Sequence, residues 1–186
     1  MPDDQPSTDP RGDRVGHPVS GPILILIGPP GSGKSTVGRL VAGELGVSFR
    51  DFDDDVEKEC GLPAGEVVVE LGREAFSDVE CRLIGTVLAE HAGVLALGGG
   101  TPLNPAIQEQ LKPFHSVFLD VELTELLRRE GLVTLHPWLL PNPRAHLRHL
   151  LEQRRPIYAA VSSVVVLTTG RSAPDVAAEV LLTLRQ

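Results

Sequence analysis

One nine-residue segment constrains the fold more than any other feature of the chain: Gly28-Pro-Pro-Gly-Ser-Gly-Lys-Ser-Thr36. It matches the pattern G-x-x-x-x-G-K-[ST] and directly follows the apolar run Ile23–Ile27. Glycines let successive backbone N–H groups turn inward on a polyphosphate, and the amino end of a following helix adds its positive dipole. The segment therefore predicts a strand, a phosphate-binding turn (P-loop) and a helix, in that order.

The residues at the end of this segment favour nucleotide binding over a purely structural turn. A glycine-rich turn that only joins a strand to a helix does not need a lysine and a serine after its last glycine. The lysine is expected to reach the terminal phosphates, and the serine hydroxyl to ligate Mg²⁺. We expect the nucleotide to bind at Gly28, Gly31, Ser32, Gly33, Lys34, Ser35 and Thr36.

From Gly21 onward, short apolar runs alternate with longer segments of helical period, which is typical of βαβ units around a parallel sheet. Strands are expected at Ile23–Ile27, Val47–Arg50, Val94–Leu97, Ser116–Leu119 and Val164–Leu167. Helices are expected at Lys34–Leu45, Arg73–His91, Glu122–Glu130, Arg144–Tyr158 and Asp175–Leu184. The pattern predicts an α/β fold, a doubly wound five-stranded parallel sheet flanked by helices, of the P-loop, nucleoside-monophosphate-kinase-like type.

The chain length of 186 residues fits one domain, expected at residues 21–186, preceded by a tail. Residues 1–20 carry four prolines among Asp, Ser, Thr and Gly, and almost no bulky apolar side chains. Such a segment cannot bury enough surface to fold, so a disordered tail is expected, with a docked regulatory segment as the alternative.

Composition excludes several classes of partner. The net charge is −8 and no basic run occurs, which argues against nucleic acid, because phosphate backbones are bound by clustered Lys and Arg. The longest apolar run is far too short to span a membrane, and the amino terminus lacks the order of a secretion signal. We expect a cytoplasmic protein with reduced thiols at Cys60 and Cys81, and the short loops indicate a monomer.

Two further segments place polar chemistry at expected strand ends, where an open α/β sheet has its ligand crevice. Asp51-Phe-Asp-Asp-Asp55 follows the second strand, and carboxylates there can hold Mg²⁺ through water or accept a proton from a hydroxyl. A solvated acidic helix start accounts for Asp54, Asp55 and Glu57, but less well for Asp51 and Asp53. The third strand ends in Leu97-Gly-Gly-Gly-Thr101, whose glycines allow a ligand to approach the main chain.

Other P-loop classes are excluded by missing motifs. A guanine-nucleotide switch usually carries N-K-x-D, and a larger ATPase carries an apolar run that ends in Asp-Glu; neither occurs. The P-loop, Asp51-x-Asp53, the three glycines and Arg154-Arg-Pro-Ile-Tyr158 instead resemble shikimate kinases in their order and approximate spacing. The resemblance extends from about Ile23 to the carboxyl terminus.

This resemblance implies an activity and a set of roles. The activity would be transfer of a phosphoryl group from ATP, with Mg²⁺, to the small molecule shikimate, giving shikimate 3-phosphate for aromatic amino-acid synthesis. Asp53, with Lys34 and His136, would be catalytic, Asp51 and Ser35 would serve the metal, and residues 131–141 would form a lid. The acceptor would contact Asp53, Ser77, Gly99, Gly100 and Arg154, and the adenine would lie near Arg129 and Arg171.

Two positions depart from the family pattern. Ser77 follows Phe76 where the family has an arginine that binds the shikimate carboxylate, and His136 precedes Pro137 where the lid usually has an arginine. Histidine near neutral pH is mostly uncharged, so positive charge is lost at both places. Three explanations remain open: a slower shikimate kinase that recruits Arg73, Arg82 or Arg128; a kinase for another hydroxyl substrate, such as a polyol without a carboxylate; or a nucleotide-binding regulator without turnover.

Overall fold

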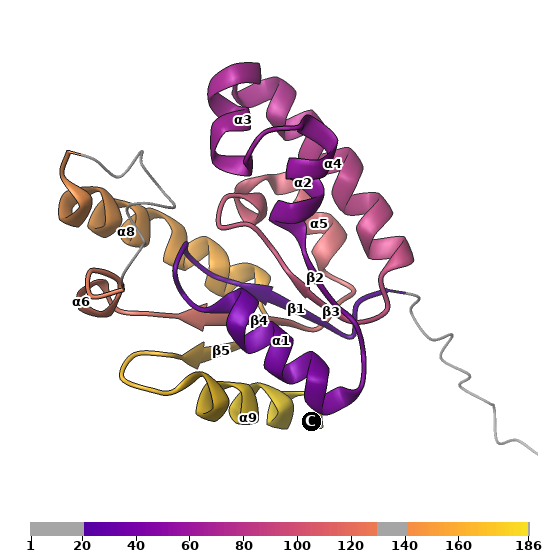
Figure 1. Ribbon diagram of the computed structural model, residues 1–186, viewed down its shortest axis with the longest axis vertical. Helices are drawn as coiled ribbons and strands as arrows, with labels where there is room; N and C mark the ends of the chain where they lie inside the picture. Colours follow the sequence, from indigo (N-terminus) through magenta and orange to yellow (C-terminus); the bar gives the residue numbers. More distant parts are fainter. Residues whose placement is uncertain (1–20, 130–140, 186) are drawn as a thin grey trace, which may run out of the picture.

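The computed structural model describes residues 21–129 and 141–185 (Figure 1). The expected tail, residues 1–20, lies outside the described residues. So does nearly all of the expected lid, including His136. Within the described residues, no helix is both long and apolar enough to cross a membrane.

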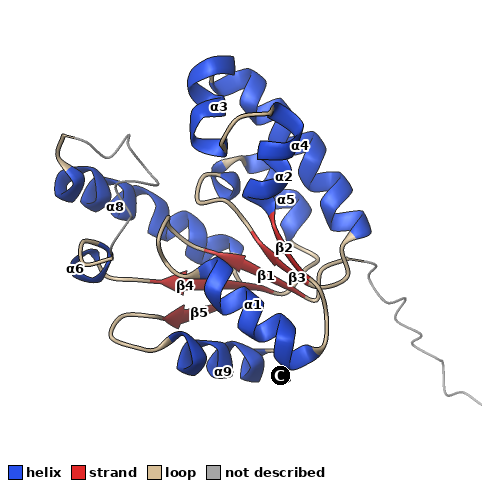
Figure 2. Ribbon diagram, in the orientation of Figure 1, coloured by secondary structure: helices blue, strands red, loops and turns tan. Residues whose placement is uncertain are grey.

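Five parallel strands form a single sheet at the centre of the molecule (Figure 2). Their spatial order is β2-β3-β1-β4-β5, so the P-loop strand lies in the middle. Strands β2 and β3 lie on one side of β1 in the sheet, and β4 and β5 lie on the other. The expected parallel, doubly wound sheet is confirmed, with strands at β1 (Leu24–Ile27), β2 (Phe49–Asp51), β3 (Val94–Ala96), β4 (Ser116–Asp120) and β5 (Val164–Leu167).

Alternation along β1 divides the interior into two apolar cores. Leu24 and Leu26 face one side, where α1 (Lys34–Leu45) and α9 (Ala173–Thr183) pack. Ile25 and Ile27 face the other, which is covered by α2 (Phe52–Cys60), α4 (Arg73–Glu90), α5 (Pro105–Leu111) and α8 (Pro143–Val161). Both faces of the strand are therefore buried, as expected for a central parallel strand. The core is almost wholly aliphatic, with Phe52, Phe118 and Tyr158 among its few aromatic side chains.

Three short α-helices are not among the helical segments expected from the sequence: α2, for which an acidic helix start was the alternative interpretation, α3 (Ala64–Leu71) and α5. Helices α2 and α5 each begin with a side-chain cap. Asp51 accepts from the Asp53 N–H at the start of α2, and Asn104 accepts from the Ala106 N–H at the start of α5. Such caps satisfy donors that the first helical turn leaves free. Conversely α6 (Leu123–Leu126) is shorter than the helix expected from Glu122 to Glu130.

Helix α8 is longer at both ends than expected and carries one side of the ligand crevice. Its amino end is capped by Asn142, which accepts from the Ala145 N–H, and Pro143 occupies the first position. Buried leucines of α8 pack on α6 in a small third core: Leu126, Leu147, Leu150 and Leu151 together with Val121. This packing anchors α8 beside the carboxyl end of β4.

Candidate functional site

The loop between β1 and α1 depends on glycine at particular positions. Gly33 caps α1 in the left-handed region, with φ 98°. A β-carbon on Gly28 would lie 2.7 Å from the Leu119 carbonyl oxygen and 2.8 Å from Ser32 Oγ. The loop therefore packs tightly on the end of β4 while its backbone curls around the amino end of α1.

Lys34 lies folded over this loop. Its Nζ donates to the carbonyl oxygens of Gly28 at 3.0 Å and Pro29 at 3.1 Å. Burial lowers the pKa of Lys34, while the nearby carboxylates of Asp53 and Asp51 oppose the shift. The ammonium group is held by weak carbonyl partners beside two acids, so it is free to exchange those partners for phosphate oxygens.

The buried hydroxyl of Ser32 fits a phosphate-binding role. The residue is 1% exposed, and among the described residues its Oγ is the buried side-chain polar atom that has no hydrogen-bond partner. An unmet buried donor costs free energy, which a phosphate oxygen would recover. The loop thus fits the phosphates of a nucleotide.

Two oxygens suited to a divalent cation converge next to the loop. Ser35 Oγ donates to Asp51 Oδ2 at 2.6 Å, which joins the start of α1 to the end of β2. Among the described residues, no group of three or more His, Cys, Asp or Glu side chains could hold a metal. Magnesium needs no such group, because it usually takes one or two protein oxygens together with water and phosphate. Ser35 and Asp51 therefore fit Mg²⁺.

Asp53 lies in the first turn of α2, two residues beyond the strand end where it was expected. Its carboxylate comes against Gly98 so closely that a β-carbon there would lie 2.3 Å from Oδ1. Although one side of Asp53 stays open to solvent, crowding by protein atoms raises its pKa, and Lys34 opposes the rise. The Asp53 carboxylate lies near the ammonium group of Lys34 and against Gly98, which has no side chain. It is therefore placed to accept a proton from a bound hydroxyl.

The turn after β3 lies between the P-loop and α8. A β-carbon on Gly99 would lie 2.8 Å from Pro30 Cδ, so the glycine is required for close contact. From the other side, Arg154 Nη1 donates to the Gly99 carbonyl oxygen at 3.0 Å. Tyr158 donates its hydroxyl to the same oxygen at 2.5 Å. The structure thus brings Gly99 and Arg154 together as expected, and adds Tyr158.

Helix α4 places one buried carboxylate, that of Glu80, beside the same region. Glu80 is 6% exposed and accepts a hydrogen bond from Thr101 Oγ1 at 2.7 Å. Burial raises the pKa of Glu80; the hydrogen bond from Thr101 opposes the rise, and Asp53 adds to it. In the described part of the chain, Glu80 forms no ion pair with Lys or Arg.

The pKa of Glu80 gives a stability prediction. Because its pKa in the folded state is raised, the folded protein binds more protons than the unfolded one, so its stabilising effect is present at low pH and is lost as pH rises through the folded pKa. Glu80→Gln keeps an acceptor for Thr101 without the charge. We expect a higher Tm than wild type at pH 8 and no advantage at pH 4. Thermal unfolding across this range tests it, with exposed Glu152→Gln as the control; equal profiles for the two variants would contradict it.

Ser77 lies three residues before Glu80 on α4, and its Oγ accepts from Asn104 Nδ2 at 2.7 Å. Asn104 also donates to Cys81 Sγ at 3.1 Å, while its side-chain oxygen caps α5. A neutral cluster therefore occupies the position where the family pattern has an arginine. Arg82 does not replace that charge, because it pairs with Glu59 at 2.6 Å on the exposed surface between α2 and α4.

The remaining expected nucleotide contacts are divided between two loops. Arg129 hydrogen-bonds the Gly31 carbonyl oxygen through Nη1, so it lies directly over the P-loop. Arg171 follows β5 and is held by the Leu167 carbonyl oxygen and by an ion pair with Glu179 on α9. Thr36 is exposed in the first turn of α1.

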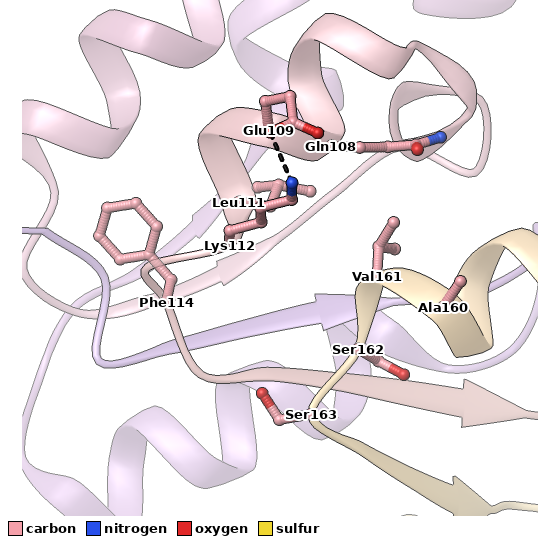
Figure 3. Close-up of a pocket in the computed structure, with 9 residues that line it drawn as sticks. All are labelled: Gln108, Glu109, Leu111, Lys112, Phe114, Ala160, Val161, Ser162 and Ser163. Carbon is pink, nitrogen blue, oxygen red and sulfur yellow. Dashed lines mark hydrogen bonds and ion pairs between the residues drawn. The ribbon is translucent and has the colours of Figure 1, made fainter.

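A separate cavity of about 290 Å³ lies near the amino ends of β4 and β5 (Figure 3). Phe114, Lys112 and Ser162 are among its lining residues, drawn from the end of α5 and the segments that enter β4 and β5. These residues precede the strands, whereas Asp51 ends β2 and the P-loop and Gly99 follow β1 and β3. The cavity is therefore distinct from the crevice at the carboxyl ends.

Comparison with known proteins identifies the family that this arrangement resembles. A family model described as shikimate kinase matches residues 30–185. The chain is 47% identical to a shikimate kinase of Salinispora arenicola, over 86% of this chain and 95% of the relative. It is 43% identical to a shikimate kinase of Thermobifida fusca, over 87% and 94%.

Solved structures agree on the fold. The shikimate kinase from Acinetobacter baumannii, determined in complex with shikimate, superposes with a TM-score of 0.81 at 31% identity, covering 89% of this chain and 93% of that one. A gluconokinase from Sinorhizobium meliloti has a TM-score of 0.60 at 21% identity, over 90% and 93%, which shows the shared fold alone.

Proposed function

The chain belongs to the shikimate kinase family, and we propose that it transfers the γ-phosphoryl group of ATP to a hydroxyl of shikimate, giving ADP and shikimate 3-phosphate. The observation that carries this proposal is the position of Asp53. Its carboxylate lies against Gly98, within the electrostatic reach of Lys34. An acid at this point stands between the phosphate-binding loop and the glycine turn, where donor and acceptor would meet.

Different residues would carry out the separate parts of the reaction. The backbone from Gly31 to Ser35 would hold the phosphates, and Lys34 would neutralise charge that develops on the transferred group. Asp53 would orient the acceptor hydroxyl and take its proton as the oxygen attacks in line. Arg154 would bind the acceptor carboxylate, since its guanidinium offers further donors besides the one on Gly99.

Magnesium is the implied metal. Ser35 would be its protein ligand, and Asp51 would hold it through water; the two oxygens are already 2.6 Å apart. When bound beside Ser35 and Asp51, Mg²⁺ would offset negative charge on the phosphates. Removal of divalent cations with EDTA should therefore abolish turnover, and added Mg²⁺ should restore it.

A monomeric state and a cytoplasmic location stay predictions from the sequence.

The test is a coupled ADP-release assay with Mg-ATP and a panel of acceptors: shikimate, gluconate, neutral polyols and no acceptor. We expect release that depends on shikimate. Release with a neutral polyol instead would favour a kinase of changed specificity, for which the neutral Ser77–Asn104 pair is the supporting observation. ATP binding without release for any acceptor would leave only a nucleotide-binding protein.

Ser77 provides a direct test of acceptor recognition. An arginine at this position would lie one helical turn from Glu80, which would give the buried carboxylate a cationic partner, and it would offer a charged donor to the shikimate carboxylate. We expect Ser77→Arg to lower the KM for shikimate about tenfold. The measurement is steady-state kinetics with shikimate varied.

Thr86→Arg is the matched control, because it adds the same charge at an exposed position of α4, about two and a half turns beyond Ser77. Its KM should stay within about twofold of wild type. If Ser77→Arg leaves the KM unchanged, or if both variants lower it equally, a missing positive charge at Ser77 does not limit acceptor binding.

A further inference from the structure

The peptide group between Gly99 and Gly100 is held from one side by two donors. Tyr158 Oη lies 2.5 Å and Arg154 Nη1 3.0 Å from the Gly99 carbonyl oxygen. A carbonyl oxygen has two lone pairs, so its capacity to accept is used in full. Both donors come from α8, which fixes the direction in which this carbonyl points.

The direction of the carbonyl fixes that of the next amide. In a trans peptide the C=O and N–H bonds point opposite ways, so the Gly100 N–H points away from α8. In the described part of the chain, this N–H donates to no backbone or side-chain acceptor. Gly100 is exposed, and a β-carbon there would meet no atom within 4 Å. The amide is thus a free donor beside open space. It lies two residues after Gly98, the residue that Asp53 contacts.

The hydroxyl of Tyr158 is held rigidly. The residue is fully buried, and its ring packs on Phe118 of β4 at a centroid distance of 5.2 Å. Burial raises the pKa of Tyr158, so the hydroxyl keeps its proton and donates at neutral pH. Arg154 is four residues earlier on α8 and therefore on the same face of the helix. The hydroxyl of Tyr158 thus reaches the turn from the side that faces α8.

We propose that Tyr158 is a positioning residue for the acceptor: by holding the Gly99 carbonyl together with Arg154, it aims the Gly100 N–H at a bound acceptor oxygen. This inference rests on the proposed function. Without the hydroxyl, Arg154 alone holds the carbonyl, and the Gly99–Gly100 peptide can rotate. The phosphate contacts are made by another loop, so acceptor binding should weaken while nucleotide binding does not.

The test is Tyr158→Phe, which removes one oxygen and keeps the ring on Phe118. We expect the KM for the acceptor to rise about tenfold while the KM for ATP stays within about twofold. Thr183→Val is the matched control, because it removes another buried hydroxyl, bonded to His115 at 3.0 Å and to the Val180 carbonyl oxygen at 2.7 Å, far from the crevice. It should lower Tm without changing either KM.

A second readout needs no acceptor. In ¹⁵N-labelled protein without ligand, Tyr158→Phe should shift the Gly100 amide resonance, because the Gly99–Gly100 peptide loses one of the two donors that orient it, whereas Thr183→Val should not. Equal effects of the two variants on Gly100 and on both KM values, or a rise in the ATP KM as large as that for the acceptor, would overturn the proposal. If wild-type protein shows no turnover with shikimate while Tyr158→Phe still shifts the Gly100 resonance, the proposed function alone is contradicted.

Discussion

Asp53→Asn is expected to lower kcat about 10³-fold with shikimate while the affinity for ADP remains close to that of wild type. The amide keeps the size of the side chain and its place against Gly98 but cannot take a proton. Lys34 loses a neighbouring carboxylate at the same time, yet the phosphate-binding backbone is untouched. Steady-state kinetics give kcat, and titration calorimetry gives the ADP affinity.

Asp54→Asn is the matched control for this variant. It makes the same change of charge at the next residue, which is exposed on α2. We expect its kcat and KM to stay within about twofold of wild type. Equal turnover by the two variants would remove Asp53 from the mechanism.

Lys34→Met is expected to have the second large effect, a fall of about 10³-fold in kcat and a weakening of ADP binding of about tenfold. Methionine preserves the length of the side chain but brings no charge to the phosphates. Its loss also frees the carbonyl oxygens of Gly28 and Pro29, which Lys34 now holds. Kinetics and calorimetry under the same conditions measure both effects.

Arg39→Met separates the role of Lys34 from the charge of α1 as a whole. Arg39 lies on the same helix, with its guanidinium carbon 4.9 Å from the centre of the Phe49 ring, and is exposed. We expect its kcat and ADP affinity to remain near those of wild type. If both variants lose the same activity, the general positive potential of α1 explains the effect, and a specific contact from Lys34 is not needed.

The sheet was predictable because its strands are apolar on both faces. Ile23–Ile27 and Val164–Leu167 show no alternation of polar and apolar residues, and the glycine-rich segment determines the turn and helix after the first of them. The second strand was shifted by one or two residues, since Asp51 both ends β2 and caps α2. A polar residue with two such roles looks like a loop in the sequence.

The helices that were missed are short and depend on tertiary packing. Helix α5 has seven residues, and its signals are a single asparagine cap and Pro105 at the first position. Isolated helices of this length are unstable, so periodicity gives little warning of them. Their positions matter to the site, because Asn104 at the start of α5 holds Ser77.

The site was predictable where a residue is part of a contiguous motif. Lys34, Ser35, Asp51 and Asp53 were found in this way, and the structure brings them together. Contacts between distant segments were not predictable: the partners of Gly99 are 55 and 59 residues away. Tyr158 was visible within the R-x-P-x-Y segment, but nothing in that segment indicates which backbone group its hydroxyl reaches.

If this chain moves a phosphoryl group from ATP to one hydroxyl of shikimate, the chemical structure of the product is the decisive observation. Purified protein, Mg-ATP and shikimate would be followed by ³¹P NMR. We expect a phosphate monoester whose phosphorus couples to the proton on carbon 3 of shikimate, formed in step with ADP. Inorganic phosphate with unchanged shikimate, or ATP that is bound but never consumed, would contradict it.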